Sequence, residues 1–338
     1  MARFLDRLRG RPNPREPEPE DAGQPASDAP QGNPRRRELK PDPDRIGISG
    51  SVPFVRLPDP ARLFTERAER LRVLAPGHVM EGYLSFLAAI ATAQAAIVAS
   101  GADAIRPLAL PADAAQRSEH GMPPLSAELL GSDPAFAAGF DRLLDAIDLD
   151  AAPAPARAAR DALRAATSED WLDLASQIFQ GAYPYERLGE CVFAAAALQI
   201  YLAAQAAQLD AKALKPVADG VCPACGGGAV SSLIVSWTPA DKARYCACSL
   251  CGTLWNQVRI RCTACGSGEG ISYYGLDEIS KDVQVETCTT CNSYIKHLHQ
   301  DRAPGLDPIA DDVASYGLDL KIAEEGFRRA GLNPLFLT

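Results

Sequence analysis

The chain has 338 residues, 47% of them hydrophobic, with a formal net charge of −9 and a pI near 5.1. This length allows two or three domains and at least one sizeable core. An acidic chain gains nothing from a phosphate backbone, so the composition argues against general nucleic-acid binding. No apolar run is expected to reach the roughly 18 residues that a membrane span needs, so membrane insertion is not expected.

Residues 1–50 are predicted to form a disordered tail rich in proline and charge. The first 45 residues hold nine prolines, ten Lys or Arg and nine Asp or Glu, a composition that cannot bury a core. The triplet Arg35-Arg36-Arg37 resembles part of a twin-arginine signal, but no apolar segment follows it. With no signal-peptide pattern at the start, we expect a cytoplasmic protein whose thiols stay reduced.

Residues 51–215 are predicted to form a helical domain. Six segments are rich in Ala, Leu, Arg and Glu, which lose little conformational freedom in a helix. These segments are 63–74, 81–99, 134–147, 156–166, 169–179 and 190–213. Two apolar stretches, 86–99 and 193–207, contain glutamines and are expected to be buried core helices.

Eight of the ten cysteines then form two copies of one pattern, C-x2-C-x22-C-x2-C, displaced by 40 residues. Two C-x2-C pairs supply the four thiolates of a tetrahedral metal site. The candidate metal ligands are Cys222, Cys225, Cys248 and Cys251 in the first copy, and Cys262, Cys265, Cys288 and Cys291 in the second. Because a complete one-site unit is duplicated, each copy should hold its own ion, without cross-bracing between the copies.

The residue after each cysteine pair supports this interpretation. It is Gly226, Gly252, Gly266 and Asn292 in the four pairs. A metal knuckle reverses the backbone through a residue at positive φ, which glycine tolerates best and asparagine next. Zinc ribbons and rubredoxin-type iron sites share this pattern, so the spacing does not distinguish zinc from iron.

Two other uses of the cysteines are less compatible with the pattern. Disulfides would need an oxidising compartment, and a redox dithiol would need one C-x2-C, whereas the chain has four at matched spacing. Residues 219–302 carry seven Lys or Arg and eight Asp or Glu. Since four thiolates outweigh the charge of one ion, the metal region is acidic, which further disfavours nucleic acid.

Residues 216–258 and 259–303 are predicted to form two tandem rubredoxin-like or zinc-ribbon-like β-modules. Leu254, Val258 and Ile260 alternate with polar or aromatic residues, as in a half-buried strand. Further strands are expected at 232–237, 271–276 and 294–299. Each module is too small to hold a core without its metal, so the metal should supply folding energy.

Residues 304–338 are predicted to form a C-terminal helix and tail, which makes the chain a multi-domain α+β protein. The helix should carry an apolar stripe and end at Gly331. The stripe consists of Ile309, Val313, Tyr316, Leu320, Ala323 and Phe327.

The remaining thiols and imidazoles carry weaker signals. Cys191 is interpreted as a small buried hydrophobe. Cys246 stands where the second copy has Glu286, so it is interpreted as a bystander. Four sulfurs already complete a tetrahedron, so His297 and His299 are expected behind a metal site or at the surface.

The sequence does not indicate an enzyme. We find no nucleophile elbow, P-loop, dinucleotide fingerprint or defined carboxylate pair in it. A metal ion held by four cysteines also has no free coordination position for a substrate.

The combination of these motifs resembles the FdhE family of formate dehydrogenase accessory proteins, over about residues 63–337. The specific stretches in the metal region are CPACG at 222–226, CSLCGTLW at 248–255, VRIRC at 258–262 and CTTCNSYIK at 288–296. Outside it, RAERLRVLA at 67–75, YLSFLAAIATAQ at 83–94, GMPPL at 121–125, ADDVASYGLDLKIAEEGF at 310–327 and LNPLFL at 332–337 also fit the family.

The resemblance implies a cytoplasmic assembly factor required for formate dehydrogenase activity, which binds the catalytic subunit before membrane delivery. It also implies that the eight cysteines hold two metal ions per chain and take part in this binding, with rubredoxin-type iron favoured and zinc the alternative. A rubredoxin-like electron-transfer or redox-sensing protein is the alternative function. Self-association into a homo-oligomer is compatible with the sequence.

Overall fold

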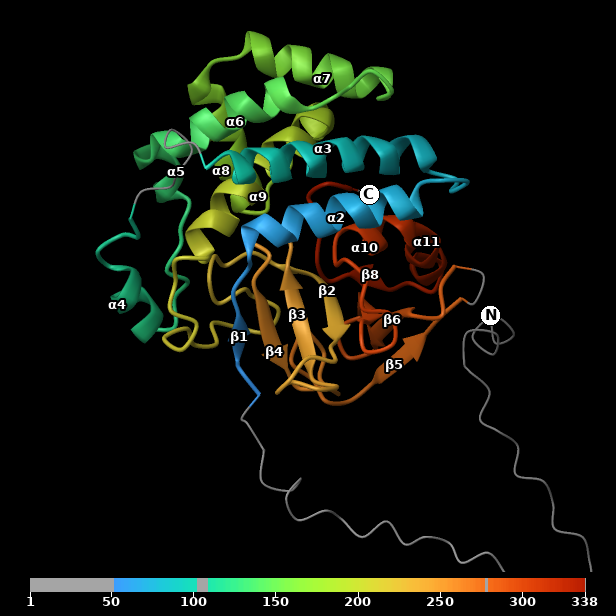
Figure 1. Cartoon of the computed structure of the whole chain (residues 1–338). Coiled ribbons are helices and arrows are strands. Elements are labelled where there is room, and N and C mark those ends of the chain that lie inside the picture. Colours follow the sequence, from blue (N-terminus) through green and yellow to red (C-terminus); the bar gives the residue numbers. More distant parts are fainter. Residues whose placement is uncertain (1–51, 102–108, 277–278, 338) are drawn as a thin grey trace, which may run out of the picture.

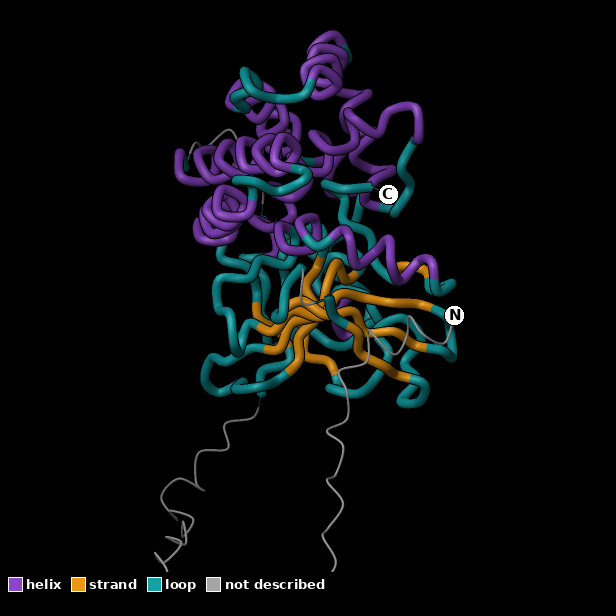
Figure 2. The backbone as a smooth tube through the Cα atoms, turned by 90° about the vertical axis from the view of Figure 1, so that its right-hand side faces the viewer, coloured by secondary structure: helices purple, strands orange, loops and turns teal. Residues whose placement is uncertain are grey.

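The computed structural model describes residues 52–101, 109–276 and 279–337. The predicted disordered tail, 1–50, lies outside the described residues. A layer of helices is stacked on one continuous β-sheet (Figure 1). The view at right angles shows the same two layers, with the strands gathered on one side of the helices (Figure 2).

All six predicted helices of the helical layer are present, together with two short ones. The bounds are α2 Pro60–Leu74, α3 Glu81–Ser100, α4 Ala114–Glu119, α5 Glu128–Ser132, α6 Pro134–Ala146, α7 Ala154–Ala165, α8 Ser168–Phe179 and α9 Leu188–Ala206. Side-chain caps start three of them: Asp59, Asp133 and Thr167 each accept an amide of the first turn. Helix α9 ends at Ala206, earlier than the predicted residue 213.

Helix α9 is the centre of the helical layer. It contacts α3, α6, α7 and α8, and most of its residues are buried. By length and composition alone, Glu81–Ser100 and Tyr185–Ala206 are both apolar enough to cross a membrane, so the expectation that no run reaches that length is wrong. Their apolar windows are 50% and 78% buried within the protein, and a core helix passes the same test.

The sheet has the strand order β1-β4-β3-β2-β7-β6-β5, and β8 pairs with β7. The bounds are β1 Val55–Arg56, β2 Ala229–Ile234, β3 Arg244–Cys248, β4 Leu254–Gln257, β5 Ile271–Tyr274, β6 Val283–Cys288, β7 Ser293–His299 and β8 Arg328–Arg329. Each cysteine copy contributes three antiparallel strands, and the parallel pair of β2 and β7 joins the copies. The two predicted β-modules therefore share one sheet, and their separate folding remains a prediction.

The predicted burial of the segment after Cys251 is wrong. Strand β4 ends at Gln257, Trp255 is buried, and Val258 and Ile260 are 60% and 62% exposed. The alternation fails because the chain leaves the sheet after Gln257. The chain then turns at residues 259–260, and the guanidinium of Arg244 donates to the carbonyls of residues 258, 259 and 261.

The C-terminal segment forms two helices, α10 (Ala310–Ala314) and α11 (Tyr316–Glu324), where one helix ending at Gly331 was predicted. The break lies at Ser315, whose backbone angles (φ −96°, ψ 25°) depart from helical geometry. Ile309 and Val313 are buried as the stripe predicted, but Leu320 is 50% exposed.

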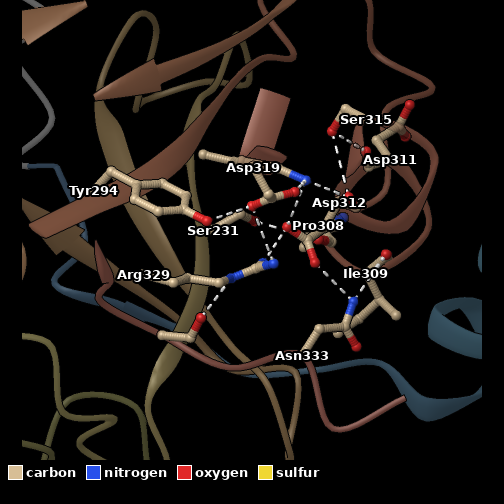
Figure 3. Close-up of polar contacts among 12 residues, drawn as sticks. Ser231, Tyr294, Pro308, Ile309, Asp311, Asp312, Ser315, Asp319, Arg329 and Asn333 are labelled. Carbon is tan, nitrogen blue, oxygen red and sulfur yellow. Dashed lines mark hydrogen bonds and ion pairs between the residues drawn. The ribbon is translucent and has the colours of Figure 1, made fainter. Parts of the chain in front are cut away.

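A buried charge network joins these helices to the sheet (Figure 3). Lys296 of β7 lies 2.5 Å from an Asp319 oxygen and 3.3 Å from an Asp312 oxygen. Arg329 of β8 pairs with the same two carboxylates, and Tyr294 donates to Asp319 at 2.8 Å. The two cations balance the two carboxylates in a region where all four side chains are largely buried.

Candidate metal centres

The structure gathers the eight predicted cysteines into two groups of four. We call Cys222, Cys225, Cys248 and Cys251 site 1, and Cys262, Cys265, Cys288 and Cys291 site 2. In each group all four sulfurs lie within 4.8 Å of one another. The grouping follows the two sequence copies, as the duplication predicted.

The sulfur spacing fits a tetrahedral metal ion. In site 1 the Sγ atoms of Cys222 and Cys251 are 3.7 Å apart, and those of Cys225 and Cys248 are 3.5 Å apart. The corresponding separations in site 2 are 3.7 and 3.8 Å. Metal–sulfur bonds of about 2.3 Å in a tetrahedron place sulfurs about 3.8 Å apart. All eight are free thiols, so the donor set could hold two metal ions.

The local backbone forms the predicted knuckles. Gly226, Gly252, Gly266 and Asn292 have φ values of +79°, +74°, +70° and +52°, which confirms the prediction at all four pairs. The amides of Gly226 and Gly266 donate to the carbonyls of Cys222 and Cys262 at 2.9 and 3.0 Å. The second pair of each site follows directly from β3 or β6, whose last residues are Cys248 and Cys288.

Hydrogen-bond donors point at several sulfurs. The amides of Leu250 and Cys251 lie 3.4 Å from the Cys248 Sγ, and the Thr253 hydroxyl lies 3.1 Å from the Cys251 Sγ. Burial raises the pKa of the Cys288 thiol, but amide hydrogen bonds, chiefly from residues 291 and 290, outweigh burial and lower the pKa to about 7. Such donors stabilise thiolates, the form that binds metals.

Site 1 is enclosed by the helical layer. Its four cysteines are buried. A Cβ atom at Gly252 would lie 2.8 Å from the Leu63 side chain of α2, and the Leu125 amide donates to the Ala224 carbonyl at 3.1 Å. Gln199 of α9 donates to the Ser249 carbonyl at 2.9 Å. Site 1 therefore forms part of the contact between the sheet and the helices.

Site 2 faces solvent. Cys265 is exposed and Cys291 is half-buried. The nearest side-chain atoms to a Cβ built at Gly266 belong to Asp219 and Arg261, which are themselves on the surface. The two sites therefore have the same ligand set but different surroundings.

The two spare cysteines are buried, in agreement with the interpretation of Cys191 as a small buried hydrophobe and of Cys246 as a bystander. Cys191 lies in α9 with no exposed surface. Cys246 is equally buried and has the Thr263 hydroxyl 3.9 Å away. Burial raises the pKa of each thiol to about 11, so both remain protonated at neutral pH.

Arg244 connects the two copies, although no motif in the sequence marks it. Its guanidinium, 1% exposed, donates to Ser232 at 2.6 Å, to Thr263 at 2.8 Å and to Glu286 at 2.9 Å. It also donates to the Arg261 carbonyl next to the first ligand of site 2, at 2.9 Å. These partners lie 12 to 42 residues away in the chain, so no local sequence pattern reveals them.

The two histidines lie within the sheet and not behind a sulfur cluster. His297 is 4% exposed, with its Nδ1 3.2 Å from the Ser232 hydroxyl. Its ring contacts those of Tyr273 and His299. His297 fills neither of the two expected roles, because it is buried and the contacts above are with Ser232, Tyr273 and His299, none of which is a metal ligand.

His297 should make the protein sensitive to mild acid. Burial, and then the nearby positive charge of Arg244, hold the pKa of His297 well below its usual value. The unfolded chain takes up a proton near pH 6.5 while the folded chain does not. The free energy of unfolding should therefore decrease as the pH falls below about 6.5, by up to about 1.4 kcal/mol per pH unit.

Urea unfolding of the metal-loaded protein at several pH values between 7 and 5.5 measures this effect. The free energy of unfolding of His297→Asn should decrease less steeply with falling pH than that of the wild type. The two proteins have all other acid-sensitive groups in common, so the difference in slope reports on His297. Equal slopes for the two proteins would contradict the assignment.

Comparison with known proteins agrees with this architecture. Three family models match: "FdhE, N-terminal" over residues 52–219, "FdhE, central domain" over 221–259 and "FdhE, C-terminal domain" over 260–336. Site 1 thus falls in the central match and site 2 in the C-terminal match. The crystal structure of the FdhE protein from Pseudomonas aeruginosa is similar, with a TM-score of 0.74 and 31% identity, covering 84% of this chain and 99% of that one.

Curated relatives match over nearly their full length. The Protein FdhE homolog of Rhizobium meliloti strain 1021 is 38% identical over 302 residues, 88% of this chain and 98% of the relative. The Protein FdhE of Escherichia coli K12 is 32% identical over 288 residues, 84% of this chain and 91% of the relative. With all three family models matched and both cysteine groups assembled, the chain belongs to the FdhE family.

Proposed function

We propose that this protein is an accessory factor for formate dehydrogenase, which binds the catalytic subunit in the cytoplasm before that subunit reaches the membrane. The family membership carries this proposal, because the match extends over residues 52–336 and includes both four-cysteine sites. The accessory role itself follows from the resemblance described above.

The surroundings of the sites support a binding role over a catalytic one. Four sulfurs fill a tetrahedron, so a metal held there keeps no position for substrate. A cleft of about 650 Å³ lies between α2, the sheet and residues 304–308, with Cys248 in its lining. Two of its arginines, Arg67 and Arg70, are paired with Asp307 and Asp311. These charges hold α2 against the C-terminal segment, an arrangement that suits structural contact better than acid–base chemistry.

We further propose that each site holds one iron ion in the rubredoxin manner, with zinc as the alternative. The tetrahedral four-sulfur geometry suits both ions. Zinc has a filled d shell and no redox chemistry, whereas ferric thiolate sites are coloured. Metal analysis and a visible spectrum of protein purified without oxygen distinguish the two.

One observation favours a second function, that of an electron carrier or redox sensor. The exposure of Cys265 brings site 2 close to solvent, where a partner could exchange electrons with a bound iron ion. This alternative requires a reversible reduction potential and a partner reductase. A zinc-loaded protein that still supports formate dehydrogenase activity would exclude it.

Deletion of the gene tests the accessory role. We expect formate oxidation by the membrane enzyme to be largely lost in the deletion strain. Wild-type protein supplied in trans should restore it. Normal formate oxidation in the deletion strain, or formate oxidation by the purified protein alone, would contradict the proposal.

A further inference from the structure

The two cysteine copies meet head to tail in the sheet. The strands of copy 1 run in the order β4-β3-β2 and those of copy 2 in the order β7-β6-β5. The first strand of copy 1, β2, therefore pairs with the last strand of copy 2, β7, and the pair is parallel. Strand β5 is the first strand of copy 2 and so corresponds to β2. If the same contact were repeated, β5 would pair in parallel with a further strand equivalent to β7.

The two ends of the sheet differ in their strand pairing. At one end, β1 pairs with β4, the last strand of copy 1. At the other end, β5 pairs only with β6 within the described part of the chain, and it lies at the outer end of the sheet (Figure 1). An open edge of this kind can accept an extended chain by main-chain hydrogen bonding.

The backbone of β2 shows which groups the contact uses. The Val235 amide donates to the Ala243 carbonyl at 3.0 Å. Bonded pairs alternate along an antiparallel ladder, so the amides and carbonyls of Ser232 and Ile234 point away from β3. They point toward β7, whose residues 296–299 lie opposite residues 231–234 of β2.

The backbone of β5 presents the same groups to the open edge. The Thr289 amide donates to the Gly270 carbonyl at 3.0 Å, so by the same alternation Ile271 and Tyr273 point away from β6. Tyr273 lies opposite Glu286 as Ser232 lies opposite Cys246. Glu286 and Cys246 are the equivalent positions of the two copies, so Tyr273 corresponds to Ser232.

We propose that β5 is the docking edge of this protein, and that an extended segment of the formate dehydrogenase catalytic subunit adds to it as a parallel strand. The inference rests on the proposed function for the identity of the partner. The site itself is inferred from the β2–β7 contact, which shows how this repeat receives a strand.

The neighbours of the edge define the chemistry of the segment. Leu233 of β2 is buried beside Leu298 of β7, and Tyr274 takes the place of Leu233 in copy 2. The segment should therefore place an apolar side chain beside Tyr274 and polar side chains at the alternate positions. Ile271 pairs with Cys288, so the segment passes beside site 2, and loss of the site 2 metal should loosen the edge.

Tyr273→Pro tests the edge directly, because Tyr273 corresponds to Ser232, which lies within the β2–β7 contact. Proline removes the outward amide of Tyr273, while the neighbouring residues Ser272 and Tyr274 keep their bonds to β6. The matched control, Tyr273→Ala, loses the same side chain but keeps the amide. We expect the proline variant to bind the purified catalytic subunit about tenfold more weakly than the alanine variant, as loss of one to two main-chain hydrogen bonds implies. Metal content and circular dichroism should match in the two variants.

Hydrogen exchange provides a second measurement that needs no substitution. In the wild-type complex, the outward amides of Ile271 and Tyr273 should gain protection. Wild-type binding with no protection there, and equal binding by the Tyr273→Pro and Tyr273→Ala variants, overturns the docking edge but leaves the proposed function intact. Absence of any complex with the wild type overturns both. Protection of these amides in the isolated protein together with dimer formation would identify a second copy as the occupant and also overturn the proposal.

Discussion

Replacing Cys222 by serine should unfold most of the protein, whereas Cys265→Ser should remove one metal ion and leave the helical layer folded. Structural four-cysteine metal sites contribute on the order of 10 kcal/mol to folding, comparable to the whole stability of a typical domain. Site 1 is buried and contacts α2 and α9, so its loss exposes the contact between the layers. Site 2 lies at the surface around the exposed Cys265, so its loss should stay local.

Metal content, circular dichroism and thermal melting of the two variants distinguish these outcomes. Cys265→Ser should retain one metal equivalent and most of the helical signal, with loss of order confined to residues 262–291. Cys246→Ser is the matched control, because this thiol is buried but belongs to neither site, and it should retain both metal equivalents. Equal loss of helix in the Cys222 and Cys265 variants would show that the two sites do not differ as described.

Lys296→Met should destabilise the protein by about 3–5 kcal/mol, because it leaves two buried carboxylates with one cation. Among the described residues, Arg329 would then be the only cation that forms ion pairs with both Asp312 and Asp319. Asp312 has no exposed side-chain surface, so water cannot replace the lost ammonium. The network also anchors α10, α11 and β8 to the sheet (Figure 3), and its disruption should loosen the C-terminal segment first.

Thermal unfolding of the metal-loaded variant measures this effect, with an expected decrease in Tm of about 10 °C. Lys321→Met is the matched control, since Lys321 makes an exposed ion pair with Glu324 at 3.4 Å. Exposed pairs contribute little, so its Tm should change by about 2 °C or less. If the two methionine variants melt at the same temperature, the buried network does not stabilise the protein as argued.

The cysteine sites were largely predictable from the sequence because their signal is local. Spacing selected the eight ligands, the 40-residue offset selected the grouping, and the four residues at positive φ were identified by type. The long helices were predictable for a similar reason, since propensity and capping residues act within one turn.

The joining of the two copies was not predictable in the same way. The β2–β7 contact and the Arg244 network bring together residues far apart in the chain, and neither leaves a local pattern. Strand β4 illustrates the difference: its alternation suggested burial of Val258 and Ile260, but the carbonyl contacts of Arg244 turn this segment into an exposed linker. Likewise, the predicted C-terminal helix is divided at Ser315, although its apolar stripe continues past that residue.

Binding of the purified, metal-loaded protein to the catalytic subunit of formate dehydrogenase tests the central claim most directly. We predict a saturable complex that carries two metal ions per copy of this protein, and no formate oxidation by this protein alone. Cys265→Ser should weaken the complex while its helical signal persists. A metal-loaded wild-type protein that forms no complex with the catalytic subunit would contradict the account.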